Sequence, residues 1–126
     1  MAGLDPTERV RFRTLIASLT ADRTVLLSTH IIADIEAGTD RVVLLKGGRL
    51  LADTTTSGLL QRARGHVWEI RRNLETARRL QASQPISSLV TGPEGVLLRL
   101  VADTAPLPEA RPADPSLEDA YLLAIR

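Results

Sequence analysis

His30 is the residue whose position most suggests a catalytic or binding role. It follows Ser28 and Thr29 at the end of a short apolar run, and ligand sites in layered α/β domains lie beyond the carboxyl ends of buried strands. An imidazole N–H can donate a hydrogen bond to a phosphate oxygen as charge develops during phosphoryl transfer. A lone histidine is more often structural or solvent-exposed, so its position alone leaves both interpretations open.

Other combinations of reactive residues are weaker candidates for a site. Ser28, His30 and Asp34 could suggest a hydrolase, but no nucleophile elbow surrounds the serine. His30 and His66 lie far apart in the sequence and the chain has no cysteine, so we expect no metal site. These residues therefore do not by themselves predict an enzyme.

The sequence contains no loop of the type that holds nucleotide phosphates. A P-loop has the form Gly-x-x-x-x-Gly-Lys-Ser/Thr, whereas the single lysine, Lys46, is followed by glycine. Gly47-Gly48 could be taken for a phosphate loop, but no helix follows it closely. Two adjacent glycines supply the positive φ angles of a tight hairpin, and we predict that turn here.

Composition excludes several classes of protein. The chain has 126 residues, with 16 Lys+Arg against 15 Asp+Glu, so no excess of cations is available to attract nucleic acid. Aromatic residues make up 2%, too few for base stacking. No apolar run approaches the roughly 18–20 residues of a membrane span, and the first residues do not form a signal peptide. We expect a cytoplasmic protein with no direct membrane insertion.

Helix and strand alternate around His30. A predicted helix begins at Asp5 and runs to about residue 20. A proline follows Asp5 directly and a glutamate lies three residues after Asp5, which is typical of a helix start. Val25–Leu27 is a continuous apolar run, typical of a strand buried in a parallel sheet, and Ile31–Ile35 follows it as a short helix. This order indicates an α/β domain. Because strands to flank Val25–Leu27 are absent, we also predict exposed apolar surface and self-association.

The rest of the chain predicts a second unit, with the division between residues 64 and 65. Four prolines fall between residues 106 and 115, so that segment is expected to be an irregular linker. The other predicted elements are a hairpin at Arg41–Asp53, a helix at Gly58–Ala63, a strand at His66–Arg71, a helix capped by Asn73, a hairpin at Ile86–Val101 and a helix that begins at Ser116.

Three segments occur in an order that resembles one protein family. They are Ala2-Gly3-Leu4-Asp5-Pro6 before a helix, Thr24-Val25-Leu26-Leu27-Ser28-Thr29-His30, and Asp40-Arg41-Val42-Val43-Leu44-Leu45-Lys46-Gly47-Gly48-Arg49. This arrangement is similar to the C-terminal part of an ABC transporter ATP-binding subunit. Residues 1–64 would then be part of a P-loop NTPase domain of the α/β class. Residues 65–126 resemble the small α+β extension of ATPase subunits from bacterial drug- or lipid-type exporters, which ends in a helix like the one that begins at Ser116.

The resemblance implies roles for particular residues. His30 would be the switch histidine, which contacts the γ-phosphate of ATP and helps to position the attacking water. Ala2, Gly3, Leu4 and Asp5 would form the D-loop at the interface of an ATPase dimer, and the helix-capping role of Asp5 is compatible with that. The intact family protein binds ATP and Mg²⁺. It pairs with a second ATPase subunit and with a transmembrane subunit at the inner face of the cell membrane, where it drives export.

The catalytic motifs of that family are missing from this sequence. There is no Asp-Glu dipeptide, no Leu-Ser-Gly-Gly-Gln signature and no P-loop. We therefore expect a C-terminal fragment that neither binds ATP tightly nor hydrolyses it alone. The alternative is a non-enzymatic interaction module that pairs with an intact ABC ATPase. Arg71-Arg72 and Arg78-Arg79 are expected to form a solvated face, with a docking surface as the alternative.

Overall fold

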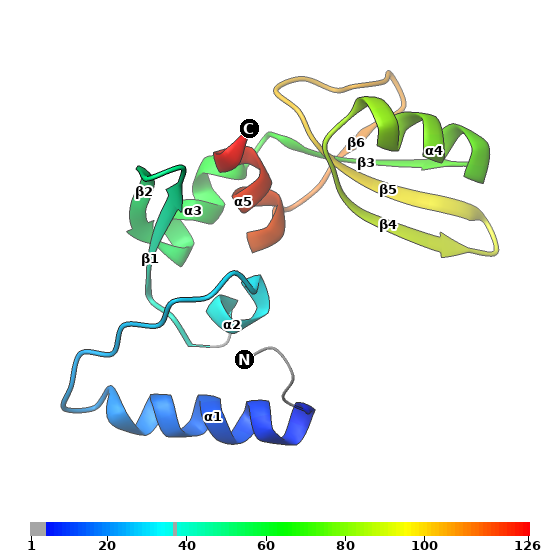
Figure 1. Cartoon of the computed structure of the whole chain (residues 1–126). Helices are drawn as coiled ribbons and strands as arrows, with labels where there is room; N and C mark the ends of the chain where they lie inside the picture. Colours follow the sequence, from blue (N-terminus) through cyan, green and yellow to red (C-terminus); the bar gives the residue numbers. More distant parts are fainter. Residues whose placement is uncertain (1–4, 37) are drawn as a thin grey trace. The chain divides into compact units, whose positions relative to one another are not determined.

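The computed structural model describes residues 5–36 and 38–126, and the chain divides into two compact units, Met1–Asp40 and Arg41–Arg126 (Figure 1). This division differs from the one expected after residue 64, since residues 41–64 belong to the same unit as the C-terminal part. The contacts explain the grouping, because the helix at Thr56–Ala63 packs against the last helix of the chain. Domains at residues 1–64 and 65–126 therefore stay a prediction.

The first unit contains two helices, α1 (Pro6–Leu19) and α2 (Ile32–Glu36). The start of α1 is as predicted: the Oδ1 atom of Asp5 accepts a hydrogen bond from the Glu8 N–H at 2.8 Å. This contact satisfies one of the N–H groups that the first turn of a helix leaves without an intrahelical partner.

The prediction of a buried strand at Val25–Leu27 is wrong. The segment forms no strand, and Leu26 is 95% exposed. A strand buried on both faces needs neighbours to pair its backbone and to cover its side chains. All the paired strands in the described part of the chain are antiparallel, and they lie after residue 40. The expected exposure of apolar side chains is confirmed at this segment.

The second unit begins with the predicted hairpin, β1 (Arg41–Lys46) and β2 (Arg49–Thr55). Its turn is made by Gly47 and Gly48, whose φ angles of 57° and 76° are the positive values that a tight hairpin requires. Helix α3 (Thr56–Ala63) follows directly, and the Thr55 hydroxyl caps it by accepting a hydrogen bond from the Gly58 N–H at 2.9 Å.

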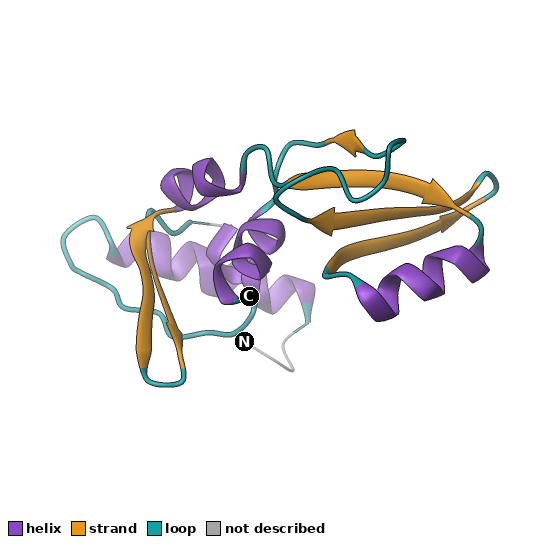
Figure 2. Ribbon diagram, turned by 90° about the horizontal axis from the view of Figure 1, so that it is seen from above, coloured by secondary structure: helices purple, strands orange, loops and turns teal. Residues whose placement is uncertain are grey.

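The second unit also contains a four-stranded antiparallel sheet, in the order β4-β5-β3-β6. Its strands are β3 (Val67–Arg72), β4 (Ile86–Gly92), β5 (Gly95–Val101) and β6 (Arg111–Pro112), and β6 is a short strand inside the expected linker. Helix α4 (Leu74–Ser83) lies along one face of the sheet (Figure 2). Ala77 from α4 packs there against Ile70, Leu98 and Leu100, each at most 2% exposed.

Asp119 connects the last helix, α5 (Leu117–Ile125), to the sheet. Its carboxylate accepts hydrogen bonds from the Ser116 N–H at 2.7 Å and from Arg99 of β5 at 2.8 Å. Burial acts to raise the pKa of Asp119, but hydrogen bonds from Ser116, Ser87 and Arg99 outweigh it and lower the pKa. The capping box was predicted from the sequence, whereas the ion pair with Arg99 was not.

The two units together are a mixed α/β structure with antiparallel sheets, which confirms the expected fold class. None of the helices in the described ranges has the length and apolar character needed to cross a membrane.

Candidate functional site

The predicted D-loop falls mostly outside the described residues, which begin at Asp5. Ala2, Gly3 and Leu4 are therefore not placed, and their expected role at a dimer interface stays a prediction. Asp5 itself is exposed and caps α1. The structure thus shows the helix-capping role of Asp5 and leaves the D-loop role open.

His30 is exposed in the turn that leads into α2. Thr29, the preceding residue, stabilises the backbone of this turn, because its hydroxyl accepts a hydrogen bond from the Ile31 N–H at 3.0 Å. Hydrogen bonds of this type, in which a threonine hydroxyl accepts from the N–H two residues later, fix a turn without the help of a sheet. The geometry therefore presents the imidazole of His30 to solvent from an ordered backbone.

Asp34 contacts the same turn through Thr29. Its side chain is fully buried, and its Oδ2 atom accepts a hydrogen bond from the Thr29 hydroxyl at 3.0 Å. The Oδ1 atom lies 3.7 Å from a guanidinium nitrogen of Arg9 in α1. The Arg9 N–H in turn donates to the Asp5 carbonyl at 3.0 Å. A continuous series of contacts therefore joins the first turn of α1 to the backbone beside His30.

This arrangement argues against the Ser28–His30–Asp34 hydrolase hypothesis. A triad needs the carboxylate to orient the imidazole, whereas the contacts of Asp34 go to Thr29 and Arg9. His30 remains exposed. The Asp34 carboxylate therefore contacts the residue that forms the turn, Thr29, and not the imidazole of His30.

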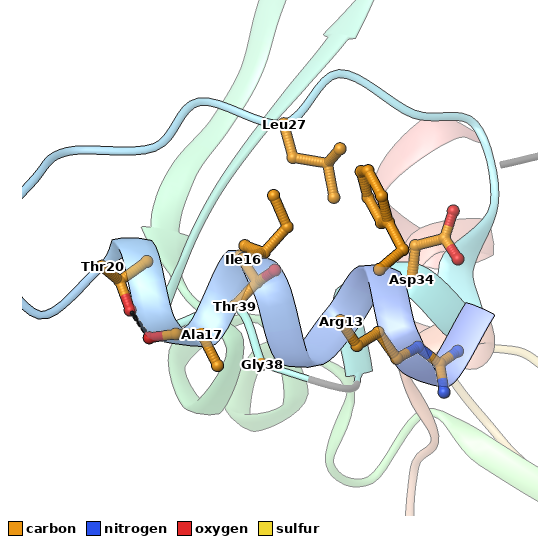
Figure 3. Close-up of a pocket in the computed structure, with 9 residues that line it drawn as sticks. Arg13, Ile16, Ala17, Thr20, Leu27, Asp34, Gly38 and Thr39 are labelled. Carbon is orange, nitrogen blue, oxygen red and sulfur yellow. Dashed lines mark hydrogen bonds between the residues drawn. The ribbon is translucent and has the colours of Figure 1, made fainter. Parts of the chain in front are cut away.

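A small pocket of about 60 Å³ lies between α1 and the segment around α2 (Figure 3). Arg13 and Asp34 supply its charged atoms, and the Arg13 guanidinium also donates to the Ala33 carbonyl at 3.4 Å. The other lining residues are Phe12, Ile16, Ala17, Thr20, Leu27, Gly38 and Thr39. Sites for drug-sized ligands have volumes of about 300–1,000 Å³, so this pocket is too small to hold a nucleotide.

The second histidine lies in the other unit, in different surroundings. His66 has its Nδ1 atom 3.0 Å from the Arg64 carbonyl and its Nε2 atom 3.7 Å from Asp103. The pKa of Asp103 is lowered, chiefly by its hydrogen bond and ion pair with Arg126 and to a smaller extent by His66. No group of three or more histidine, cysteine, aspartate or glutamate residues in the described ranges could hold a metal ion.

The chain matches no family model. It is 36% identical over 106 residues to the phosphonates import ATP-binding protein PhnC of Anaeromyxobacter dehalogenans, a match covering 84% of this chain and 21% of that protein. Uncharacterized ABC transporter ATP-binding proteins of Nostoc sp. and Synechocystis sp. are 38% and 36% identical over 61 and 67 residues. These matches cover 48% and 52% of this chain, and 18% and 19% of the two proteins.

These homologues are ATP-binding subunits of ABC transporters. The chain spans about a fifth of the length of each of them. The match of 106 residues necessarily includes parts of both compact units, because the chain has only 126 residues and the units meet after Asp40. The similarity is therefore not confined to the three N-terminal segments that resemble ABC transporter ATP-binding subunits most closely.

Asp34 and Arg9 are the residues of this site that sequence analysis missed. The sequence suggested Asp34 only as a hydrolase partner, and it suggested no role for Arg9 in this site. One signal was available, because a carboxylate five residues after Thr29 is within reach of a turn-forming hydroxyl. A sequence does not show, however, that the carboxylate is buried and that an arginine from another helix meets it.

Proposed function

We propose that this chain acts in the ATP-binding subunit of an ABC transporter, where it supplies the switch histidine. The observation that carries this proposal is the similarity over 106 residues to an ATP-binding protein of this class. His30, exposed at the end of an ordered turn, would donate a hydrogen bond from its imidazole to the terminal phosphate of ATP. A donor fixed in advance stabilises charge that develops during phosphoryl transfer.

Two further groups of residues would support that role. Ala2, Gly3, Leu4 and Asp5 would form the D-loop, at the contact with a second ATP-binding subunit. The contacts from Arg9 through Asp34 to Thr29 would keep the His30 turn in register with the helix that follows the D-loop.

ATP and Mg²⁺ are the ligands that this proposal implies. An exposed imidazole suits contact with a phosphate, but the pocket of about 60 Å³ does not suit a nucleotide. The described residues also offer no acidic cluster for a metal, and the sequence has no P-loop. The other contacts to ATP and all contacts to Mg²⁺ would therefore come from residues that this chain does not contain. We propose that the chain alone neither binds ATP tightly nor hydrolyses it.

The proposed assembly includes a second ATP-binding subunit and a transmembrane subunit at the cytoplasmic face of the membrane. For the direction of transport we propose export, because residues 65–126 resemble the extension of exporter ATPase subunits. Import is the second candidate, since the Anaeromyxobacter relative is named as a phosphonates import protein. ATP-dependent uptake of a labelled substrate by inside-out membrane vesicles supports export, and uptake by right-side-out vesicles loaded with ATP supports import.

Purification from the source cell tests the proposal. The chain carries an affinity tag after Arg126 and is isolated from detergent-solubilised membranes. We expect it to be recovered with a protein that has membrane-spanning helices and with Mg²⁺-dependent ATPase activity. Recovery without a membrane protein and without ATP hydrolysis contradicts the proposal.

A second candidate function is a non-enzymatic module that binds an intact ABC ATPase. Exposed apolar side chains on the β1–β2 hairpin favour it, since Val43, Leu45 and Leu50 are 53%, 71% and 61% exposed and surfaces of this kind mark interaction sites. In that case ATPase activity would be recovered with the chain but would not depend on His30. Comparison of the purified assembly with and without a His30→Ala substitution separates the two candidates.

A further inference from the structure

A pocket of about 410 Å³ lies at the edge of the four-stranded sheet, where β6 ends its pairing with β3. Strand β6 pairs only with Trp68 and Glu69 of β3, so within the part of the chain that the structure describes the remainder of β3 has no strand on that side. Five of the six lining residues are charged: Glu69, Arg71, Arg72, Glu109 and Arg111, with Leu97 as the sixth. This composition suits a charged ligand.

The strand register places two of these arginines on one face of the sheet. Arg111 is directly opposite Glu69 on the neighbouring strand, and residues in that relation point to the same face. Arg71 follows Glu69 by two residues and so points to this face as well. Leu97 of β5 is directly opposite Arg71, so it adds an apolar side chain to the same face as the charged residues.

The two carboxylates of the pocket already have cationic partners. Glu69 forms an ion pair of 2.7 Å with Arg99, and Glu109 forms an ion pair with Arg72. The charge of Glu109 is therefore balanced by Arg72, whereas Arg99 shares its single charge between Glu69 and Asp119.

Arg71 and Arg111 retain most of their capacity for an added anion. Arg71 makes one ion pair, a long one of 4.0 Å, with Glu94, whose side chain is 80% exposed. Such a contact at the surface is worth little. Arg111 is exposed, and within the described ranges it makes no ion pair. The pocket thus presents two guanidinium groups with unused donors.

We propose that this pocket binds a small phosphate-bearing molecule through Arg71 and Arg111. A phosphate monoester carries a charge of about −1.5 to −2 near pH 7 and three terminal oxygens. It can accept paired hydrogen bonds from two guanidinium groups at once, whereas a carboxylate has only two oxygens to share. The volume of the pocket leaves room beside the phosphate for an organic part that packs on Leu97.

A titration of the full chain by NMR tests the proposal, with inorganic phosphate, AMP and vesicles of phosphatidylcholine with phosphatidylglycerol as probes at matched ionic strength. We expect saturable binding of phosphate and of AMP, with shifts confined to amides near Arg71, Leu97 and Arg111. The variants Arg71→Gln and Arg111→Gln should each weaken binding about fivefold or more, since each removes one charged partner. Circular dichroism confirms that each variant is folded.

Arg78→Gln is the matched control, because it removes one exposed arginine from α4, on the opposite face of the sheet. It should leave the affinity unchanged. Tighter binding of AMP than of phosphate supports contact between an organic part and Leu97, and equal binding supports a site for the phosphate group itself. The proposal is overturned if neither probe binds saturably, if Arg78→Gln weakens binding as much as Arg71→Gln does, or if only the vesicles bind.

Discussion

Replacement of Asp119 by alanine is expected to destabilise the unit of residues 41–126 by about 2–4 kcal/mol. Its side chain is 0% exposed, and it connects the first turn of α5 to strand β5. The substitution removes the Asp119 half of the capping box, in which the carboxylate accepts from the Ser116 N–H, and one of the two carboxylates bound to Arg99. The two losses act on different neighbours, so both contribute to the change in the free energy of unfolding.

The magnitude follows from those two losses. A complete N-terminal cap is worth about 1 kcal/mol, so loss of the Asp119 half of the capping box costs at most about that amount, and a hydrogen bond to a charged group is worth about 1.5–3 kcal/mol. Arg99 is 22% exposed and keeps Glu69 and the Asp114 carbonyl as partners, so the cost of leaving its charge without Asp119 lies well below that of a fully buried arginine.

Urea unfolding followed by tryptophan fluorescence measures this change. Trp68 is the single tryptophan of the chain and lies in β3, beside β5, so its emission reports on the sheet that carries Arg99. Glu118→Gln is the matched control, because Glu118 is an exposed carboxylate in the same first turn of α5. A difference of less than about 0.5 kcal/mol between the two variants would refute the reasoning, since that is the range of ordinary surface substitutions.

Three further results are expected from the same contacts. The pKa of Asp119 is lowered in the folded state, so its contribution to stability is complete above about pH 4 and declines as the pH falls through the folded pKa. In urea unfolding at several acidic pH values, the free energy of unfolding should therefore fall less steeply with decreasing pH for Asp119→Asn than for the unchanged chain. Lys46→Met removes the 2.6 Å hydrogen bond to the carbonyl at the end of α5. It should lower the urea midpoint by an amount that corresponds to about 0.5–1.5 kcal/mol in the free energy of unfolding. Asp34→Ala removes the acceptor of the Thr29 hydroxyl and should speed amide exchange in α2 about tenfold by NMR, whereas the exposed Glu36→Ala should leave it nearly unchanged.

Local signals in the sequence were sufficient to predict most elements of the fold. Four helices are capped by a side chain that accepts a hydrogen bond from the N–H three residues later, at Asp5, Thr55, Asn73 and Ser116. Gly47-Gly48 makes the hairpin turn, with two positive φ angles. These features depend on residues close together in the chain, so no knowledge of tertiary contacts was needed to find them.

Features that depend on distant partners could not be predicted in this way. The apolar run Val25–Leu27 has the composition of a central strand, but a strand forms only where a neighbour pairs with its backbone, and none does so in the described part of the chain. Asp119 was recognised as half of a capping box, yet Arg99 lies 20 residues away in β5. Asp34 likewise meets Arg9 only through tertiary folding.

The candidate site shows the same division between local and distant information. The sequence places His30 directly after Thr29, but it left the exposure of His30 open, and the buried strand expected before it does not form. The burial of Asp34 and its contact with α1 follow from packing, which a single sequence does not display. The pocket beside Arg71 and Arg111 depends on the pairing of β6 with β3 across more than 40 residues. The sequence indicated only a solvated face at Arg71-Arg72, with a docking surface as the alternative, and gave no role to Arg111.

The most direct test of the central claim is the rate of ATP hydrolysis by the assembly purified with this chain, compared for His30→Ala and His66→Ala. These are the two histidines of the sequence, so each variant removes one imidazole and only the first removes the proposed donor to ATP. The account predicts that His30→Ala lowers turnover by about 100-fold or more while the assembly stays intact, and that His66→Ala leaves turnover nearly unchanged. Equal turnover in the two variants would contradict it.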